Sequence, residues 1–361
     1  MTTTAPRAEA GRPPEGAPAG TEGAPALPPA RGELSAAVTG RLRGRPAALP
    51  GPGAVEAADP YGEDVQLALH LCYELHYRGF AGVPDTAEGD LELLRLRVLL
   101  EDRFEEALRA GCEGSARPEE VFEALLTEPP DGRGVSRFLL RHGTLRQLRE
   151  YAVLRSVHQL RESDPHAWVL PRLWGRAKAG MATVLYEEFG CGREERVHAR
   201  LYADLMRALG LDPRYGHYLP VVGAPVLATA NLMSLFGLRR ARRGALVGHF
   251  AALEISSPPA ASWHAAALRR CGADEAAARF YDEHVEADAV HEQLVRREVV
   301  GGLLAEEPGL AADVAFGARA TGLLEDALAE SVVRAWQTGG SALRAPVEET
   351  EEIEEGTEEE A

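Results

Sequence analysis

Apolar residues recur at intervals of three and four along most of the chain, and no stretch shows the alternation that predicts a β-strand. Glycines and prolines break this pattern into short segments, which is typical of helices joined by tight turns. The periodicity indicates a compact all-α protein built as a helical bundle. The segments predicted as helices are residues 63–80, 90–111, 118–128, 136–162, 171–190, 193–210, 225–237, 242–257, 262–272, 274–300 and 320–337.

The two ends of the chain lack this periodicity. Residues 1–58 are crowded with proline, glycine and alanine, and we expect them to form a disordered tail. Residues 346–361 carry an acidic run and are expected to be a second disordered tail. The prediction is therefore one helical domain over residues 59–345, between two tails.

Composition narrows the class of protein. The net charge of −17 argues against nucleic-acid binding, which needs a basic surface. No run approaches the roughly 18 apolar residues of a membrane span, and the N-terminus lacks the hydrophobic core of an export signal. The four cysteines lie far apart and form no CxxC pair, which favours reduced thiols and a cytoplasmic location.

One predicted helix stacks three metal-binding residue types on a single stripe. In "FYDEHVEADAVHEQ", His284, Asp288 and His291 are spaced by four and three residues. On an α-helix these spacings place the three side chains within about 60° of one another. A polar stripe facing water would explain two such residues, but a third member in phase favours a metal site.

Partner ligands occur on other predicted helices. Glu162 stands at a helix end in "LRESDPH", and Glu254 lies inside the otherwise apolar "HFAALEISS". Glu188 and His198 follow each other in "LYEEFGCGREERVHARLYADL". A straight helix would separate these two by about 15 Å, so they can share a site only if the chain bends at Gly190-Cys191-Gly192.

This set resembles the haem-oxygenase-like diiron oxidases and oxygenases, also called iron-containing redox enzymes. The resemblance covers about residues 60–340 and lies in "RESDPHAW", "EEFGCGREERVHARLYADLMRALGL", "GALVGHFAALEISS" and "FYDEHVEADAVHEQ". It implies a haem-oxygenase-like helical bundle with extra N-terminal helices. It also implies two irons per chain that change between Fe(II) and Fe(III), with O2 as co-substrate. The implied metal ligands are Glu162, Glu188, His198, Glu254, His284, Asp288 and His291.

The resemblance implies an enzyme of specialised metabolism that oxidises a small amine, amino acid or carboxylic acid. N-oxygenation and oxidative C–C or C–H cleavage both stay open, as do an external electron donor and a homodimer. The residue types also make physical sense, because four carboxylates balance the charge of two Fe(II) ions while neutral imidazoles hold the metal. The alternatives are a haem- or tetrapyrrole-binding protein on the same fold and a noncatalytic helical interaction module.

Three neighbours of these residues have other expected roles. We expect Glu187 to be an ion-pair partner and not a ligand. For His166 we expect a local structural hydrogen bond, with a place at the substrate channel as the alternative. His249 follows Gly248, whose missing side chain would let another helix approach closely. We interpret His249 as a packing residue or as support for a ligand.

Overall fold

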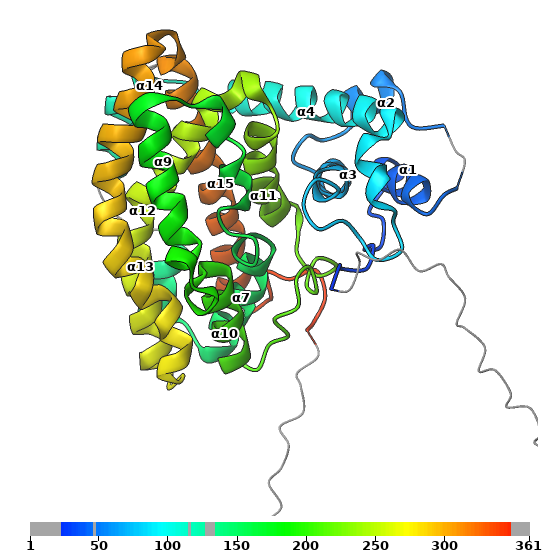
Figure 1. Cartoon of the computed structure of the whole chain (residues 1–361). Coiled ribbons are helices and arrows are strands. Elements are labelled where there is room, and N and C mark those ends of the chain that lie inside the picture. Colours follow the sequence, from blue (N-terminus) through cyan, green and yellow to red (C-terminus); the bar gives the residue numbers. More distant parts are fainter. Residues whose placement is uncertain (1–22, 46–47, 115–116, 127–133, 348–361) are drawn as a thin grey trace, which may run out of the picture.

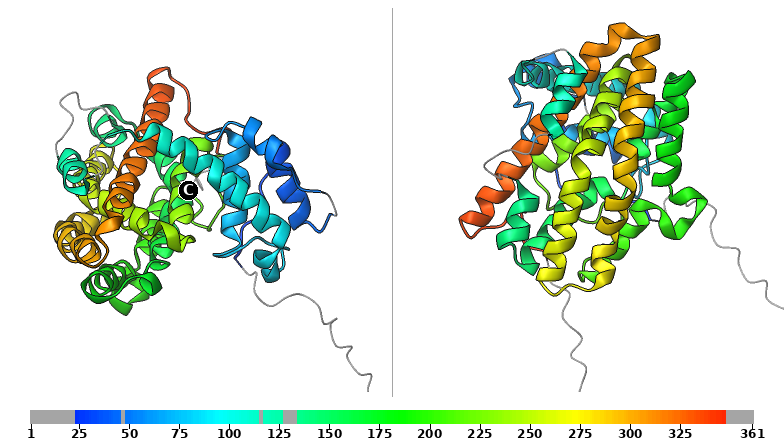
Figure 2. Two further views of the ribbon diagram at one scale, coloured as in Figure 1. Left: turned by 90° about the horizontal axis from the view of Figure 1, so that it is seen from above. Right: turned by 90° about the vertical axis from the view of Figure 1, so that its left-hand side faces the viewer.

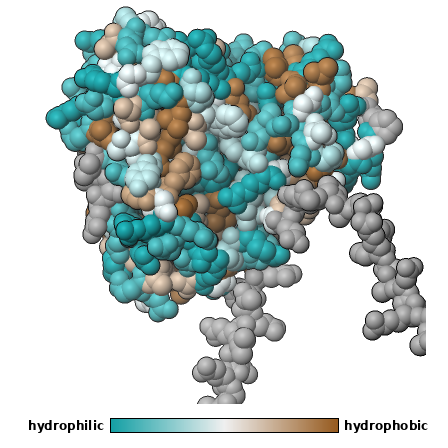
Figure 3. All heavy atoms as spheres, in the orientation of Figure 1, coloured by the Kyte–Doolittle hydropathy of each residue, from teal (hydrophilic) through white to brown (hydrophobic). Residues whose placement is uncertain are grey.

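The computed structural model describes residues 23–45, 48–114, 117–126 and 134–347, except for the side chains of residues 286–290. Within these ranges every regular element is a helix and none is a strand, so the all-α fold is confirmed (Figure 1). No helix in the same ranges is long and apolar enough to cross a membrane. The face seen in Figure 3 is mostly hydrophilic, with apolar residues gathered in a few patches.

Four helices from the first part of the chain stand on one side of the main bundle (Figures 1 and 2). They are α1 (Glu33–Leu42), α2 (Pro52–Ala57), α3 (Glu63–Glu74) and α4 (Leu91–Gly111), with a 3-10 turn, η1 (Asp85–Gly89), before α4.

The predicted disorder of residues 1–58 is wrong for α1 and α2, while residues 1–22 lie outside the described ranges. Helix α1 buries Leu34 and Val38 against the neighbouring helices. Its first amides, those of Leu34 and Ser35, donate to the carboxylate of Asp64 at 2.9 and 2.7 Å. The side chain that caps the start of this helix therefore comes from α3. The sequence of residues 1–58 alone could not indicate this cap.

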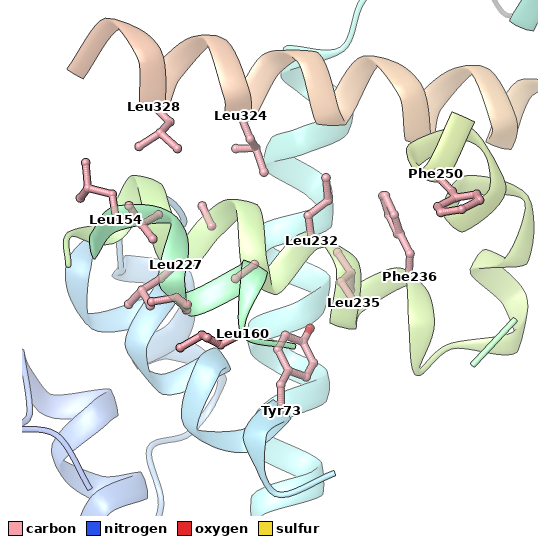
Figure 4. Close-up of a cluster of buried hydrophobic side chains, with 14 of the residues drawn as sticks. Tyr73, Leu154, Leu160, Leu227, Leu232, Leu235, Phe236, Phe250, Leu324 and Leu328 are labelled. Carbon is pink, nitrogen blue, oxygen red and sulfur yellow. The ribbon is translucent and has the colours of Figure 1, made fainter. Parts of the chain in front are cut away.

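The main bundle contains the remaining helices. Helix α11 (Ala224–Gly237) is apolar on nearly all sides and packs against α15 (Ala311–Gln337) and α3. Figure 4 shows Leu227, Leu232 and Leu235 of α11 within a cluster that also includes Leu324 and Leu328 of α15. Each fully buried leucine of this kind stabilises the fold by about 1.5–3 kcal/mol.

Around this core lie the helices that carry the candidate site, together with short connecting turns. The longer elements are α5 (Pro118–Leu126), α6 (Val135–His142), α7 (Leu145–Gln159), α9 (Gly175–Glu188), α10 (His198–Ala208), α12 (Arg243–Arg270) and α13 (Glu275–Leu294). The shorter ones are α8 (Asp164–Ala167), α14 (Gly301–Glu306), η2 (Leu170–Arg172), η3 (Gly190–Gly192), η4 (Glu194–Arg196), η5 (Arg240–Arg242), the π-helical turn η6 (Val295–Val300) and η7 (Pro308–Leu310).

Helices α12 and α15 cross in direct backbone contact. A Cβ atom on Gly248 would lie 1.9 Å from the carbonyl oxygen of Val314, and one on Gly317 would lie 1.9 Å from that of Ala245. Only glycine permits this approach at both positions. The predicted close approach at Gly248 is therefore confirmed, and α12 is fixed against the centre of the bundle just before it reaches Glu254.

Helix α12 is longer than the sequence pattern predicts. Two helices were expected, over residues 242–257 and 262–272, because Pro258 and Pro259 interrupt the pattern. The structure instead runs one helix through both prolines. Contacts with α13 and α15 along its length hold it in line, and this packing outweighs the loss of two backbone hydrogen bonds.

Candidate metal centre

Six of the seven predicted ligands converge in two groups. The Glu162 group contains Glu162, His198 and His284, and the Glu188 group contains Glu188, Glu254 and His291. Within each group the atoms that could bind a metal lie within 4.8 Å of one another, and all but Glu162 are buried. Two adjacent groups of carboxylates and imidazoles are the arrangement that a pair of metal ions requires.

The carboxylate of Glu188 lies between the two groups. Its Oε2 atom is 3.0 Å from Nδ1 of His198, which belongs to the Glu162 group. Its Oε1 atom is 3.8 Å from Nδ1 of His291 in its own group. One carboxylate with an oxygen facing each side is suited to bridging two ions.

A sharp bend brings Glu188 and His198 together. Helix α9 ends at Glu188, and after Phe189 three consecutive residues have positive φ, with values of 74° at Gly190, 53° at Cys191 and 80° at Gly192. Helix α10 then begins at His198, after the turn η4. The predicted bend is confirmed, and the two glycines supply the left-handed backbone at no steric cost.

Glu162 lies in the corner between α7 and α8. Its Oε1 atom is 3.6 Å from Nε2 of His284. The next residue, Ser163, has a positive φ of 69° and donates a hydrogen bond from Oγ to Oε2 of Glu188 at 3.1 Å. Two neighbouring residues of this corner therefore contact both groups of the site.

Helix α13 contributes residues to both groups, since His284 and His291 are two turns apart on one face. The backbone of Asp288 belongs to this helix, but its side chain lies outside the described residues. Its role as a ligand stays a prediction.

Hydrogen bonds orient the two imidazoles of α13. Nδ1 of His284 donates to the backbone carbonyl of Phe280 at 2.7 Å, which leaves Nε2 facing Glu162. Nε2 of His291 is 2.6 Å from Oε2 of Glu187, which leaves Nδ1 facing Glu254 at 3.4 Å. Such acceptors fix the tautomer and the direction of a metal-binding imidazole.

The sequence predicts Glu187 as an ion-pair partner, and the structure gives its partner as His291. The acceptor for His284 was not predictable, because a backbone carbonyl has no sequence signature.

The electrostatics of the site reflect its crowded charges. Burial alone would raise the pKa of Glu188, but His198, His284 and His291 outweigh burial and hold it at about 2. Burial opposes protonation of His291, yet its bonds and charge interactions with Glu254, Glu187 and Glu188 raise its pKa to about 9. Without metal, protons on the imidazoles balance the carboxylates, so a metal ion that binds here must displace them.

A cavity of about 450 Å³ adjoins the two groups. It reaches Glu162, Glu188, Glu254 and His284 at one end, and residues of α5, α6, α7, α12, α13 and α15 form its walls. Its aromatic wall is a stack in which His264 lies between Tyr151 and Tyr281, with ring centroids 4.8 and 4.9 Å away. This volume suits a small-molecule ligand.

Two buried histidines also line the cavity. The predicted structural hydrogen bond of His166 is wrong, since neither ring nitrogen bonds to another described residue. His166 instead packs on Phe250 and His249, and burial lowers its pKa to about 4. His158 was missed by sequence reasoning, although it stands four residues before Glu162, at the helical spacing that could have revealed it.

His249 does not line the cavity, and its Nδ1 atom is 2.7 Å from Oγ1 of Thr321 on α15. The packing role expected for it is consistent with this contact.

Comparison with known proteins identifies the family. Residues 149–326 match the family model described as iron-containing redox enzyme, which is haem-oxygenase-like. This region belongs to that family, and the match supports an oxidoreductase. The matched region includes all seven predicted ligands, whereas α1 to α4 lie outside it. No curated protein matches the chain significantly.

Proposed function

We propose that this protein is a nonhaem diiron oxidase or oxygenase that activates O2 to oxidise a small amine, amino acid or carboxylic acid. The observation that carries the proposal is the pair of carboxylate–imidazole groups with Glu188 between them. Either group alone would suit one ion of several metals. Two groups sharing a carboxylate favour a dinuclear site.

The residues present fit iron. Carboxylate oxygens and neutral imidazoles are the ligands that iron shares with manganese, and the family description favours iron. In the Glu162 group, Oε2 of Glu162 is buried and makes no hydrogen bond to a described residue, so a metal ion can use it. With Asp288 included, the predicted set carries four carboxylates, which match the charge of two Fe(II) ions.

In the proposed mechanism the Glu162 group would hold one iron and the Glu188 group the other. When bound, the iron pair supplies the electrons and the Lewis acidity for reduction of O2. The protein's own residues prepare this centre. Glu187 and the Phe280 carbonyl hold ring protons on His291 and His284, so that each imidazole presents its other nitrogen to the metal.

The cavity beside the two groups is the proposed substrate site. Its walls carry charges of both signs, because Arg155 donates to both oxygens of Glu325 at 2.9 and 3.0 Å and Asp326 lies beside them. These charges support a small substrate with an amino or a carboxyl group. N-oxygenation and oxidative C–C or C–H cleavage both remain within the proposal, because the same cavity serves either reaction.

Iron binding and oxygen reactivity test the proposal directly. The protein is titrated with Fe(II) without oxygen, and we expect about two irons per chain, followed by a transient visible absorbance on exposure to O2. H284A and H291A are expected to lose iron. Wild-type protein that binds no iron under these conditions would contradict the proposal.

The same samples separate the alternative functions. A haem protein would show a Soret band after purification, whereas each candidate imidazole here stands in a group with a carboxylate. A noncatalytic interaction module would keep its biological activity in H284A and H291A.

A further inference from the structure

Three consecutive residues in the corner between α7 and α8 contact three different helices. Arg161 points to Glu74 of α3, Glu162 to His284 of α13, and Ser163 to Glu188 of α9. The two ligand-side contacts belong to the candidate metal centre. The contact of Arg161 connects that centre with a helix outside the matched family region.

The backbone of this corner is strained. Ser163 has a φ of 69°, and among the described residues it shares a positive φ outside glycine only with Cys191. Such a conformation persists only where surrounding contacts hold it. The adjoining backbone bonds are long, at 3.3 Å from the Glu162 amide to Gln159 and 3.2 Å from the Asp164 amide to Arg161. Side-chain contacts must therefore contribute to holding the corner.

The side chain of Arg161 is among the largest fully buried ones in the molecule, at 1% exposure. Its Nη1 atom donates to Oε2 of Glu74 at 3.2 Å, and its guanidinium lies 4.6 Å from the ring centroid of Tyr77. A buried guanidinium is stable only next to a compensating charge. Glu74, also 1% exposed, supplies that charge.

Glu74 is itself held firmly in place. The hydroxyl of Tyr215 donates to both carboxylate oxygens, at 2.8 and 2.7 Å, and the Arg78 amide donates to Oε1 at 3.3 Å. The residues just before this ion pair also belong to one hydrophobic core, where Figure 4 shows Tyr73 of α3 and Leu160 of the corner. The carboxylate therefore stands at a fixed point behind the corner.

We propose that Glu74 is a positioning residue for the metal centre, which it serves by holding the Arg161 guanidinium away from the iron-binding carboxylates. The inference rests on the proposed diiron function. Without Glu74, a buried cation would remain on the residue that precedes Glu162, within the same corner as the Ser163 contact to Glu188. The guanidinium would then pair with a ligand carboxylate and compete with iron for it.

The test compares Glu74→Gln with a matched control, Glu101→Gln. Glutamine keeps the shape of residue 74 and an acceptor for Tyr215 but removes the charge. Glu101 of α4 is also 1% exposed and pairs with Arg239, with Nε 2.6 Å from its Oε2 atom. Because Glu101 does not contact the corner, both variants lose a buried charge but only one loses it next to the metal centre.

The measurements are thermal stability and anaerobic Fe(II) titration by calorimetry. We expect both variants to unfold at lower temperature than the wild type. Only E74Q is expected to bind iron more weakly, by about 10- to 100-fold for at least one of the two ions. Wild-type affinity in E74Q would overturn the inference while leaving the proposed function intact. An equal loss in E101Q would also overturn it, because the loss would then follow from destabilisation alone.

A second variant keeps the test decisive if E74Q does not fold. The double variant Glu74→Gln/Arg161→Met removes both charges and replaces the guanidinium by an apolar side chain of similar length. Because the competing cation is gone, we expect two irons per chain with an affinity close to that of the wild type. Failure of this double variant to bind iron would refute the competition between Arg161 and iron. Wild-type protein without iron affinity would refute the proposed function and this inference together.

Discussion

Replacing Glu187 tests whether an exposed residue governs the metal affinity of a buried one. Its carboxylate lies 2.6 Å from Nε2 of His291, whose side chain is fully buried, while the Glu187 side chain is 40% exposed. In E187A the imidazole loses the acceptor that fixes its tautomer and direction. Loss of such an acceptor typically weakens metal affinity by about 10- to 100-fold.

The isosteric variant E187Q gives a second measure of how much Glu187 contributes to iron affinity. In E187Q the amide oxygen still accepts a hydrogen bond from Nε2, but without a charge, and charge-assisted bonds are about twice as strong as neutral ones. We therefore expect a loss that is clearly smaller than in E187A. The order of affinity should be wild type, then E187Q, then E187A.

The assay is anaerobic Fe(II) titration with an exposed glutamate of α13 as the control. Glu283 is 30% exposed, pairs with Arg196 at 3.4 Å and belongs to neither group. E283A should bind iron like the wild type, because a surface ion pair contributes little. If E187A and E283A bind iron equally well, His291 does not depend on Glu187 and the reasoning is refuted.

Three further predictions concern packing, pH and the strained corner. G248A should destabilise the fold by about 3 kcal/mol in denaturant titrations, since its Cβ would meet the Val314 carbonyl, whereas G322A on open α15 surface should not. The pKa of His291 is raised from 6.5 to about 9, so protonation of His291 stabilises the metal-free protein. This stabilisation is complete below pH 6.5 and is lost as the pH rises through 9. Denaturant titrations of H291A should lack this loss, and the same proton should make Fe(II) affinity of the wild type rise over that pH window. S163A should lower iron affinity without lowering Tm greatly, and an unchanged affinity would contradict the role of its bond to Glu188.

Much of the fold follows from local patterns in the sequence. Periodicity alone located most helices of the main bundle, although it gave α6 and α7 as one helix, missed α14 and began α15 nine residues late. It failed for α1, whose first amides depend on Asp64 about thirty residues later. It also failed at Pro258, where packing on both flanking helices outweighs a local breaker.

The candidate site could be predicted where spacing or residue type in the sequence indicates a ligand. His284 and His291 share one stripe, and two glycines around Cys191 indicated the bend that joins Glu188 to His198. The partners that orient these groups carry no such signal. Glu187 is one residue from Glu188, but only the fold tells which imidazole it meets.

Long-range partners were beyond sequence reasoning for a further reason. Arg161 and Glu74 are separated by 87 residues, and each is an ordinary surface-type residue on its own. Their burial comes from docking of α3 against the corner after α7. A single sequence contains no trace of such a pairing.

The proline pair in α12 has a consequence for how this cavity can diversify. Pro258 and Pro259 have no amide hydrogens, so the carbonyls of Glu254 and Ile255 lose the donors that a helix supplies four residues later. Before the two prolines, α12 is held against α15 by the close contact at Gly248 and Gly317. After the prolines, Ala260, Ala261 and Trp263 line the cavity. Replacements in the downstream half can therefore reshape the chamber without transmitting strain through an unbroken backbone ladder to Glu254. Such a division would let the lining of the cavity vary while Glu254 keeps its place.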